Sequence, residues 1–501
     1  MKNIKITVVI ALGTVLVFMS QSRAEMATLE EALTVANNWI TLIIHKKGSW
    51  GGFETAEVEE IQEFKRGQRF IGYFCRVQPK GYIIISLCKG LTPVKMYSST
   101  CNLDPDSGEG MTDLVKDCME HILEGVEHLL GPIESVPSLN LRNILEINYQ
   151  PTWDELVGDF GIFKAGLESG VIEMNYQQGT QLLTSLWHQD DPYNREIPAP
   201  PPGDDCTAAR CLVGCGPLAD SQIMRFWSWP PYGDGSPYND TYDWQNMPDS
   251  LTAGSPAIRI DAVAELCHEV GVAAVEDYCG EGGCQSGNTL LENIDALTNN
   301  FRYSNSASRE ERRLYASTAD WFNAIKAQIN LNRPVLYEIP GHFIVIDGWQ
   351  EIGTPSVQEV HVVYGAGGGS DGWYALDYNI PGTDPTWQWE KMAINIVPDQ
   401  ALGTSVSGMY SRDASFPYRY FDQDATGNSA SFAAGQNIQF LPGVSVTGIS
   451  TTGGYIRFVG TSSDNTRLFS IRGTAATATV ASVQSYDGGI RLYQNGGIRF
   501  H

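Results

Sequence analysis

The sequence predicts an α+β fold that is built from three consecutive parts. The first part, residues 25–150 with a connector to about 180, mixes helical and strand-like periodicities. The second part, residues 181–398, places four helical segments before five strand-like runs, which is typical of an α+β domain with an antiparallel sheet. The third part, residues 399–501, is rich in Gly, Ser and Thr and lacks a helical period, which indicates an all-β module.

The 501-residue chain carries a formal net charge of −25, which excludes two classes of partner. Nucleic acids and anionic membrane surfaces are both bound by basic surfaces, so neither is an expected ligand. Hydrophobic residues make up 42% of the chain and charged residues 18%, a composition of folded domains rather than of disordered segments.

Residues 1–24 have the pattern of a cleaved export signal. Lys2 and Lys5 precede an apolar run over residues 4–18, and small residues before the bond after Ala24 suit a cleavage site. The apolar run is shorter than the roughly 20 residues that a membrane-spanning helix needs. We therefore expect a secreted protein, extracellular or at the cell surface, without membrane insertion.

The ten cysteines of an exported chain are candidates for disulfide bonds. Two pairs of near neighbours are the short-loop candidates, Cys206 with Cys211 and Cys279 with Cys284, although spacing alone does not fix the connectivity. Cys267 lies in an apolar stretch and is the expected buried free thiol.

Hydrophobic periodicity places the individual elements. In the first part we expect helices at 28–45 and 112–130 and strands at 69–78 and 81–88. In the second part we expect helices at 218–227, 257–270, 290–299 and 319–329, and strands at 334–339, 342–349, 357–365, 372–378 and 393–397. In the third part, residues 494–497 contain Asn-Gly, which predicts a hairpin turn.

Cys215 and His342 are the residues on which a catalytic hypothesis depends. Cys215 comes directly before a predicted helix, where the helix dipole lowers the pKa of a thiol and favours the nucleophilic thiolate. His342 follows Gly341 and opens a predicted strand, so a helix-borne cysteine and a strand-borne histidine occur in the papain-type order. The alternatives are a structural or disulfide-bonded cysteine and an ordinary structural histidine.

These segments resemble the streptopain group of papain-like cysteine peptidases, peptidase family C10. The matching residues are Cys215, Gln222-Ile223-Met224, Phe226-Trp227 and Pro230, followed by Gly341-His342 and Asp347-Gly348. Further similarity extends over about residues 28–398, including a stretch that resembles the family's propeptide, and does not reach the third part.

The resemblance implies a thiol endopeptidase that is made as a zymogen. Cys215 would be the nucleophile, His342 its partner and Gln189 a donor of the oxyanion hole, with Tyr364, Gly341 and Gly214 in substrate binding. Proteins or peptides would be the substrates, and the chain's own propeptide would be an intramolecular inhibitor. Neither a metal nor another cofactor is expected.

Two positions depart from the family pattern. Val363 stands where the family has an asparagine beside the catalytic histidine, and Ala366 stands where it has a tryptophan. Valine cannot hydrogen-bond an imidazole, so a carbonyl, a water or another side chain would have to orient His342. The alternatives are a weak or inactive peptidase-like protein that binds peptides or a partner, a surface-adhesion or carbohydrate-binding protein, and an acyl transferase of the transglutaminase type.

Overall fold

The computed structural model describes residues 23–376 except 231, 240 and 241, residues 390–398, and the backbone of ten strands between residues 409 and 500. The expected export signal, up to residue 22, lies outside the described residues. Among the described helices, none combines the length and the apolar character that crossing a membrane requires.

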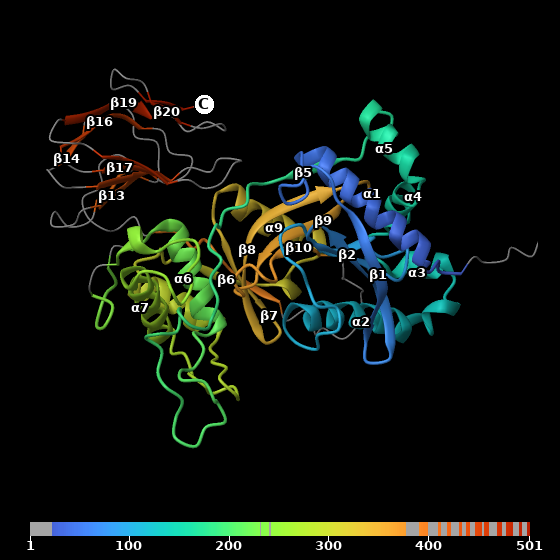
Figure 1. The fold of residues 1–501 in the computed structure, drawn as a ribbon, viewed down its shortest axis with the longest axis horizontal. Helices are drawn as coiled ribbons and strands as arrows, with labels where there is room; N and C mark the ends of the chain where they lie inside the picture. Colours follow the sequence, from blue (N-terminus) through green and yellow to red (C-terminus); the bar gives the residue numbers. More distant parts are fainter. Residues whose placement is uncertain are drawn as a thin grey trace, which may run out of the picture.

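The first part contains two long helices and four strands (Figure 1). They are α1 (Leu29–Lys47), β1 (Glu57–Arg66), β2 (Arg69–Gln78), β3 (Tyr82–Ser86), β4 (Val94–Ser98) and α2 (Gly110–Leu130). Thr28 and Glu31 form a capping box at the start of α1, which satisfies backbone N–H groups of the first turn. The sequence did not predict β1, because this edge strand buries only Phe64 fully and lacks an apolar alternation.

The expected connector is largely helical. It contains η1 (Ile133–Ser135), α3 (Ser138–Ile144), α4 (Gln150–Leu156), α5 (Phe160–Ser169) and β5 (Tyr176–Gln178). Trp153 of α4 is fully buried and its indole N–H donates to the carbonyl of Leu91 at 2.8 Å. Since α4 and α5 pack against α1 while β5 pairs with β8, the chain passes from one unit to the next between α5 and β5.

The second part supplies the remaining helices and the other strands of the large sheet. Its helices are α6 (Cys215–Trp227), η2 (Trp244–Asn246), α7 (Ala257–Ala273), α8 (Leu290–Asp295), η3 (Ala296–Asn300), η4 (Arg312–Leu314) and α9 (Thr318–Asn330). Its strands are β6 (Ser308–Glu311), β7 (Val335–Ile339), β8 (His342–Ile352), β9 (Val357–Val363), β10 (Gly372–Ala375) and β11 (Lys391–Ile394). The helix expected at 290–299 is divided, because η3 has π-helical hydrogen bonding.

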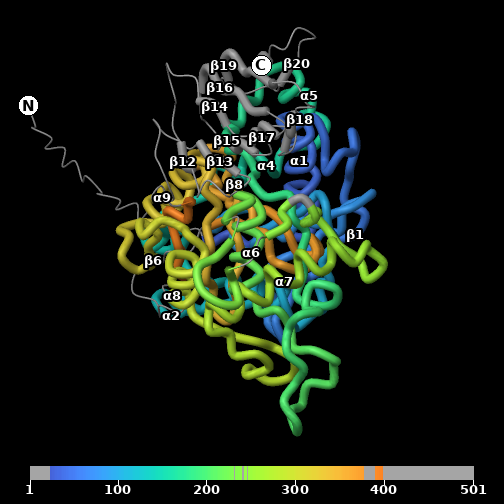
Figure 2. Tube along the Cα trace, turned by 90° about the vertical axis from the view of Figure 1, so that its left-hand side faces the viewer, coloured from blue at the N-terminus to red at the C-terminus, as the bar shows by residue number. Residues whose placement is uncertain are grey.

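One antiparallel sheet of 11 strands runs through both parts, in the order β1-β2-β3-β4-β10-β9-β8-β7-β11-β6, with β5 paired to β8. The junction is the pairing of β4 with β10, where Trp373 lies opposite Tyr97 and Tyr374 opposite Met96. Helix α1 packs on the face that carries Tyr97 and α2 on the face that carries Met96. Figure 2 is viewed from the side of α6 and α7, and it shows α6 and α7 in front of the sheet. The predicted antiparallel sheet is therefore confirmed for the second part, but it is continuous with the first.

The third part is described only as backbone strands. They are β12 (Met409–Ser411), β13 (Tyr418–Phe421), β14 (Ala430–Phe432), β15 (Asn437–Phe440), β16 (Val446–Thr452), β17 (Tyr455–Val459), β18 (Leu468–Arg472), β19 (Thr477–Val483), β20 (Ile490–Leu492) and β21 (Ile498–Phe500). They form sheets of 5, 3 and 2 strands. Strands β20 and β21 pair antiparallel on either side of the expected hairpin turn, whose own residues lie outside the described ones.

Candidate active site

Cys215 is the first residue of α6, and its position is fixed by the residue before it. Gly214 caps the helix with φ of 93°, a left-handed conformation that side chains other than glycine rarely adopt. The backbone N–H of Gly214 donates to Oε1 of Gln189 at 3.1 Å. Because Oε1 is the accepting atom, the side-chain N–H₂ of Gln189 remains available as a donor among the described residues near Cys215.

Two disulfides hold the loop that leads to Cys215. They join Cys206 to Cys284 and Cys211 to Cys279, so both short-loop pairs expected from the sequence are wrong. The loop before α6 and the loop after α7 run side by side, and cysteines therefore meet across the two loops rather than within one. Cys215 stays free, and Cys267 is a buried free thiol as predicted.

His342 opens β8 directly after the turn from β7. Ile339 pairs with His342, so Pro340 and Gly341 form a two-residue turn in which Gly341 has φ of 75° and is exposed. Nε2 of His342 lies 3.0 Å from the backbone carbonyl oxygen of Tyr364. A carbonyl can only accept, so Nε2 carries the proton and Nδ1 is the basic nitrogen. The rings of His342 and Tyr364 are in contact, with centroids 4.3 Å apart and planes tilted by 34°.

The carbonyl of Tyr364 accepts from His342 at the place where an asparagine side chain was expected to be missing. Val363 is buried and its side chain contributes no polar atom, but the backbone carbonyl of Tyr364 accepts from His342. Tyr364 is also held through the peptide group before it, because its N–H donates to Oδ1 of the buried Asp371 at 2.9 Å. Sequence reasoning missed Asp371; its place seven residues after Tyr364, just before a strand, was the available signal.

The same sheet also contains an imidazole–carboxylate pair, His361 and Asp347. Nδ1 of His361 on β9 is 2.6 Å from Oδ1 of the fully buried Asp347 on β8. Oδ2 of Asp347 accepts the backbone N–H of Leu183, which ties the segment before Gln189 to β8. In the sequence, Asp347 was notable only for its resemblance to the family pattern; in the structure, it holds His361 and Leu183.

Burial controls the protonation of Cys215 and His342. It raises the pKa of the half-buried Cys215 thiol to about 11, although hydrogen bonds from the backbone of Phe343 and from the start of α6 act in the opposite direction. Burial also lowers the pKa of His342, while its hydrogen bond to Tyr364 raises it. The expected low thiol pKa is thus wrong for this state, because desolvation outweighs the helix start.

Burial favours the neutral forms of both groups, and the Cys215 sulfur accepts a hydrogen bond from the backbone of Phe343, the residue after His342. Among the described residues, no hydrogen bond joins Cys215 to His342. Such bonds are often long in free enzymes and tighten when substrate binds. The residues present can therefore carry out a proton transfer from sulfur to imidazole once a substrate carbonyl is in place.

The Gln189 segment also contacts the loop that follows β9. His188 forms an isolated β-bridge with Ala366, and the N–H of Gly367 donates to the carbonyl of Trp187 at 3.0 Å. The loop that carries Tyr364 is therefore joined to the segment that carries Gln189. Ala366, one of the two departures from the family pattern, takes part through its backbone.

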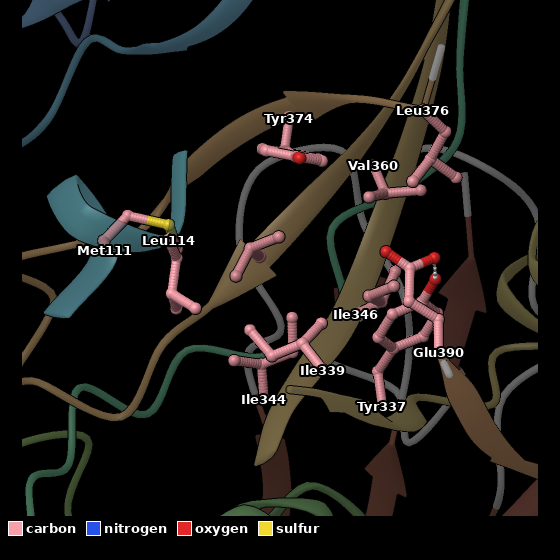
Figure 3. Close-up of a pocket in the computed structure, with 11 residues that line it drawn as sticks. Met111, Leu114, Tyr337, Ile339, Ile344, Ile346, Val360, Tyr374, Leu376 and Glu390 are labelled. Atoms are coloured by element: carbon pink, nitrogen blue, oxygen red, sulfur yellow. Dashed lines mark hydrogen bonds between the residues drawn. The ribbon is translucent and has the colours of Figure 1, made fainter. Parts of the chain in front are cut away.

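Helix α2 of the first part covers the face of the sheet next to the histidine. A β-carbon at Gly110, the first residue of α2, would lie 3.7 Å from the Tyr364 hydroxyl. Met111 and Leu114 close an apolar cavity of about 40 Å³ against strands β7 to β10 (Figure 3). Ile344 and Ile346 line it, and since side chains alternate along a strand, His342 lies on the same face.

Comparison with known proteins gives a family match over the part of the chain that holds this site. Residues 187–374 match the model of the Peptidase C10 family. Streptopain from Streptococcus pyogenes is similar at 23% identity over 366 residues, which cover 68% of this chain and 82% of the relative. Streptopain of serotype M1 is 24% identical over the same length and coverage.

Two solved structures are also similar. A fragment of prointerpain A from Prevotella intermedia, carrying a Cys-to-Ala mutation, has 19% identity and a TM-score of 0.46 and covers 69% of this chain and 99% of its own. Active wild-type interpain A cysteine protease from the same organism has 25% identity and a TM-score of 0.35, covering 43% of this chain and 94% of its own.

Proposed function

Because residues 187–374 show that the chain belongs to peptidase family C10 and is a cysteine peptidase, we propose that it is a secreted endopeptidase made as a zymogen. The observation that carries the site assignment is that Gln189, Gly214 and Cys215 are joined at one end of α6 while Tyr364 orients His342. Protein or peptide chains are the substrates. The export pattern of residues 1–24 supports secretion.

The reaction proceeds through an acyl-enzyme. Nδ1 of His342 takes the proton of the Cys215 thiol as sulfur attacks the scissile carbonyl carbon, and the carbonyl π electrons move to oxygen. The backbone N–H of Cys215 and the side-chain N–H₂ of Gln189 donate to that oxyanion. Collapse breaks the C–N bond and His342 protonates the leaving amine. Water, deprotonated by His342, then hydrolyses the thioester and restores the thiol.

The N-terminal unit fits the role of an intramolecular inhibitor. Strand β4 adds to β10, and α2 reaches Tyr364 with its first turn, so the unit covers the surface next to His342. We place the processing site between α5 and β5, where Gly170 and Val171 are exposed and Val171 is 82% accessible. This is the point where the chain leaves the N-terminal unit and joins the peptidase sheet.

The test compares wild-type full-length protein with Cys215→Ala, on casein and by intact mass. We expect the wild type to cut its own connector near residues 170–173 and then hydrolyse casein, and the variant to do neither. Hydrolysis or self-processing that persists at the wild-type rate in Cys215→Ala would overturn the assignment. N-terminal sequencing of the large product checks the processing site independently.

Val363 supports a second candidate, a peptide-binding protein with little turnover. An imidazole oriented by one backbone carbonyl, next to a thiol whose pKa is about 11, has less driving force than a preformed ion pair. An epoxide thiol inhibitor distinguishes the two candidates. Stoichiometric labelling of Cys215 together with casein hydrolysis supports the peptidase, whereas peptide binding without labelling supports the alternative.

A further inference from the structure

The carboxyl group of Glu276 lies next to the Gly214–Cys215 peptide and takes no part in the proposed reaction. Glu276 follows α7, and a β-carbon added to Gly214 would lie 2.0 Å from its Oε1. Both carboxyl oxygens of Glu276 are buried, and neither has a hydrogen-bond partner among the described residues. The carboxyl therefore packs against the peptide whose N–H is the proposed oxyanion donor.

Other acids surround this position. Asp220, on α6 one turn beyond Cys215, is fully buried, and neither of its oxygens has a partner in the described part of the chain. The charged groups that act on Glu276 are Glu292 of α8 and Asp277 and Glu281 of its own loop. All of them repel a negative charge, so the neutral acid is favoured.

The loop that carries Glu276 contains two residues in the left-handed conformation. Val275 has φ of 54°, a left-handed conformation that is a genuine outlier for a β-branched residue. Cys279, in the same loop, has φ of 61° and is bonded to Cys211. The N–H of Glu276 donates to the carbonyl of Gly271 at 2.9 Å. Strain of this kind persists only where the surrounding structure imposes it.

We infer that Glu276 is a positioning residue that acts through the nucleophile, Cys215. While the Glu276 carboxyl is protonated, it permits the Cys215 thiolate; once that carboxyl is charged, it opposes the thiolate. The two groups are close enough for the charge of Glu276 to raise the pKa of Cys215. Burial leaves that charge unscreened by solvent, and no cationic side chain in the described part of the chain acts on Glu276. The role of Cys215 as nucleophile rests on the proposed function; the effect on its ionisation does not.

The sign of the pH effect follows from the protonation of Glu276. Burial, reinforced by Glu292, Asp277 and Glu281, raises the pKa of Glu276 to about 8. Below that value the group is neutral and has no electrostatic effect on Cys215. Above it the carboxylate forms and raises the thiol pKa, and each unit of that rise lowers the thiolate fraction about tenfold. The other titratable groups around Cys215 and Glu276 are His342, whose pKa burial lowers, the buried Asp220, whose pKa burial and Glu276 raise, and the phenols of Tyr364 and Tyr278, whose pKa values burial raises.

The test measures alkylation of Cys215 by iodoacetamide in the full-length protein from pH 5 to 10, by peptide mass mapping. We compare the wild type with Glu276→Gln, which mimics the protonated acid, and with Glu281→Gln, the same change at an exposed position of the same loop. The rate ratio of Glu276→Gln to wild type should be about 1 at pH 6 and should rise several-fold by pH 9. The ratio for Glu281→Gln should not rise above 1; removing one like charge lowers the pKa of Glu276, so this ratio should fall slightly below 1 near pH 8 and return to about 1 by pH 10.

A ratio for Glu276→Gln that is independent of pH overturns the inference, as does an equal rise in Glu281→Gln. If Glu276→Gln does not fold, as judged by its thermal unfolding curve, Glu276→Met removes the charge at similar length and the same comparison decides. Because alkylation needs no turnover, the result stands apart from the casein test. A chain that shows the pH-dependent ratio but cuts no casein would retain the inference and lose the proposed function.

Discussion

The nucleophile and the histidine of this site are held in place by different means. The Cys215 loop is fixed locally, by a capping glycine and by two disulfides that link it to the loop after α7. His342 is fixed by the large sheet, by the carbonyl of Tyr364 and by an N-terminal unit whose strand β4 continues that sheet. The first region is held by covalent bonds between two neighbouring loops, whereas the second is held by hydrogen bonds within a sheet that continues into the N-terminal unit.

Gln189 joins the two regions, so its removal should have the largest effect. Its Oε1 accepts from Gly214, and its neighbours Trp187 and His188 pair with the loop that carries Tyr364. We expect Gln189→Ala to lower kcat by about 10²–10³-fold, the usual cost of losing one oxyanion donor. The exposed Gln177→Ala on β5 is the matched control and should leave kcat unchanged. A loss confined to KM would contradict the role in the transition state.

Two glycines with positive φ allow a direct comparison of the regions. Gly214→Ala would place a methyl group 2.0 Å from Oε1 of Glu276, whereas the same methyl at Gly341 would meet no atom within 4 Å. We expect about a 100-fold loss of kcat/KM for Gly214→Ala, since misplacing a reacting group by about 1 Å has that effect. For Gly341→Ala we expect only the conformational cost of roughly 1–2 kcal/mol, seen as a lower Tm. Equal losses of activity in both variants would show that the regions are not held differently.

The disulfides should contribute unequally to activity although both contribute to stability. Replacing either pair by serines should destabilise the fold by about 2–5 kcal/mol. The Cys211–Cys279 bond lies close to Cys215 and holds the loop of Glu276, so its loss should lower kcat/KM about tenfold more than loss of Cys206–Cys284. Thermal unfolding and peptide hydrolysis measure the two effects separately. If both double variants lose activity only in proportion to their loss of stability, the Cys211–Cys279 bond has no separate role in positioning Cys215.

The sequence predicted the local elements of both regions and missed the contacts between distant segments in both. The start of α6 and the strand of His342 follow from Gly, Pro and apolar spacing, which are local signals. The disulfide pairing, the β4–β10 junction and the carbonyl that replaces the missing asparagine at Val363 depend on contacts between distant segments, which no local pattern encodes. The prediction of a low pKa for the Cys215 thiol was wrong for a similar reason, because a helix start is visible in the sequence and burial is not.

The smallest expected effect concerns Asp371 and separates orientation from stability. Burial raises the pKa of Asp371 to about 6, although its hydrogen bond from Tyr364 lowers it. A carboxyl whose pKa is raised by folding binds more protons in the native state, so its contribution to stability increases as pH falls from about 6 toward its ordinary value. Protonation also replaces a charged acceptor of the Tyr364 N–H by a weaker neutral one, which loosens the carbonyl that orients His342.

Activity and stability should therefore move in opposite directions across this pH range. In the wild type we expect kcat to fall by a few-fold between pH 6.5 and 4.5, while the part of Tm that is due to Asp371 rises. Asp371→Asn keeps an acceptor for Tyr364 but cannot titrate, so the difference between the two proteins isolates the effect from that of other acids. The measurements are the pH profile of kcat, with a fluorogenic peptide, and the pH profile of Tm, by calorimetry, for both proteins. If wild type and Asp371→Asn give superimposable profiles, the histidine is oriented by the sheet alone.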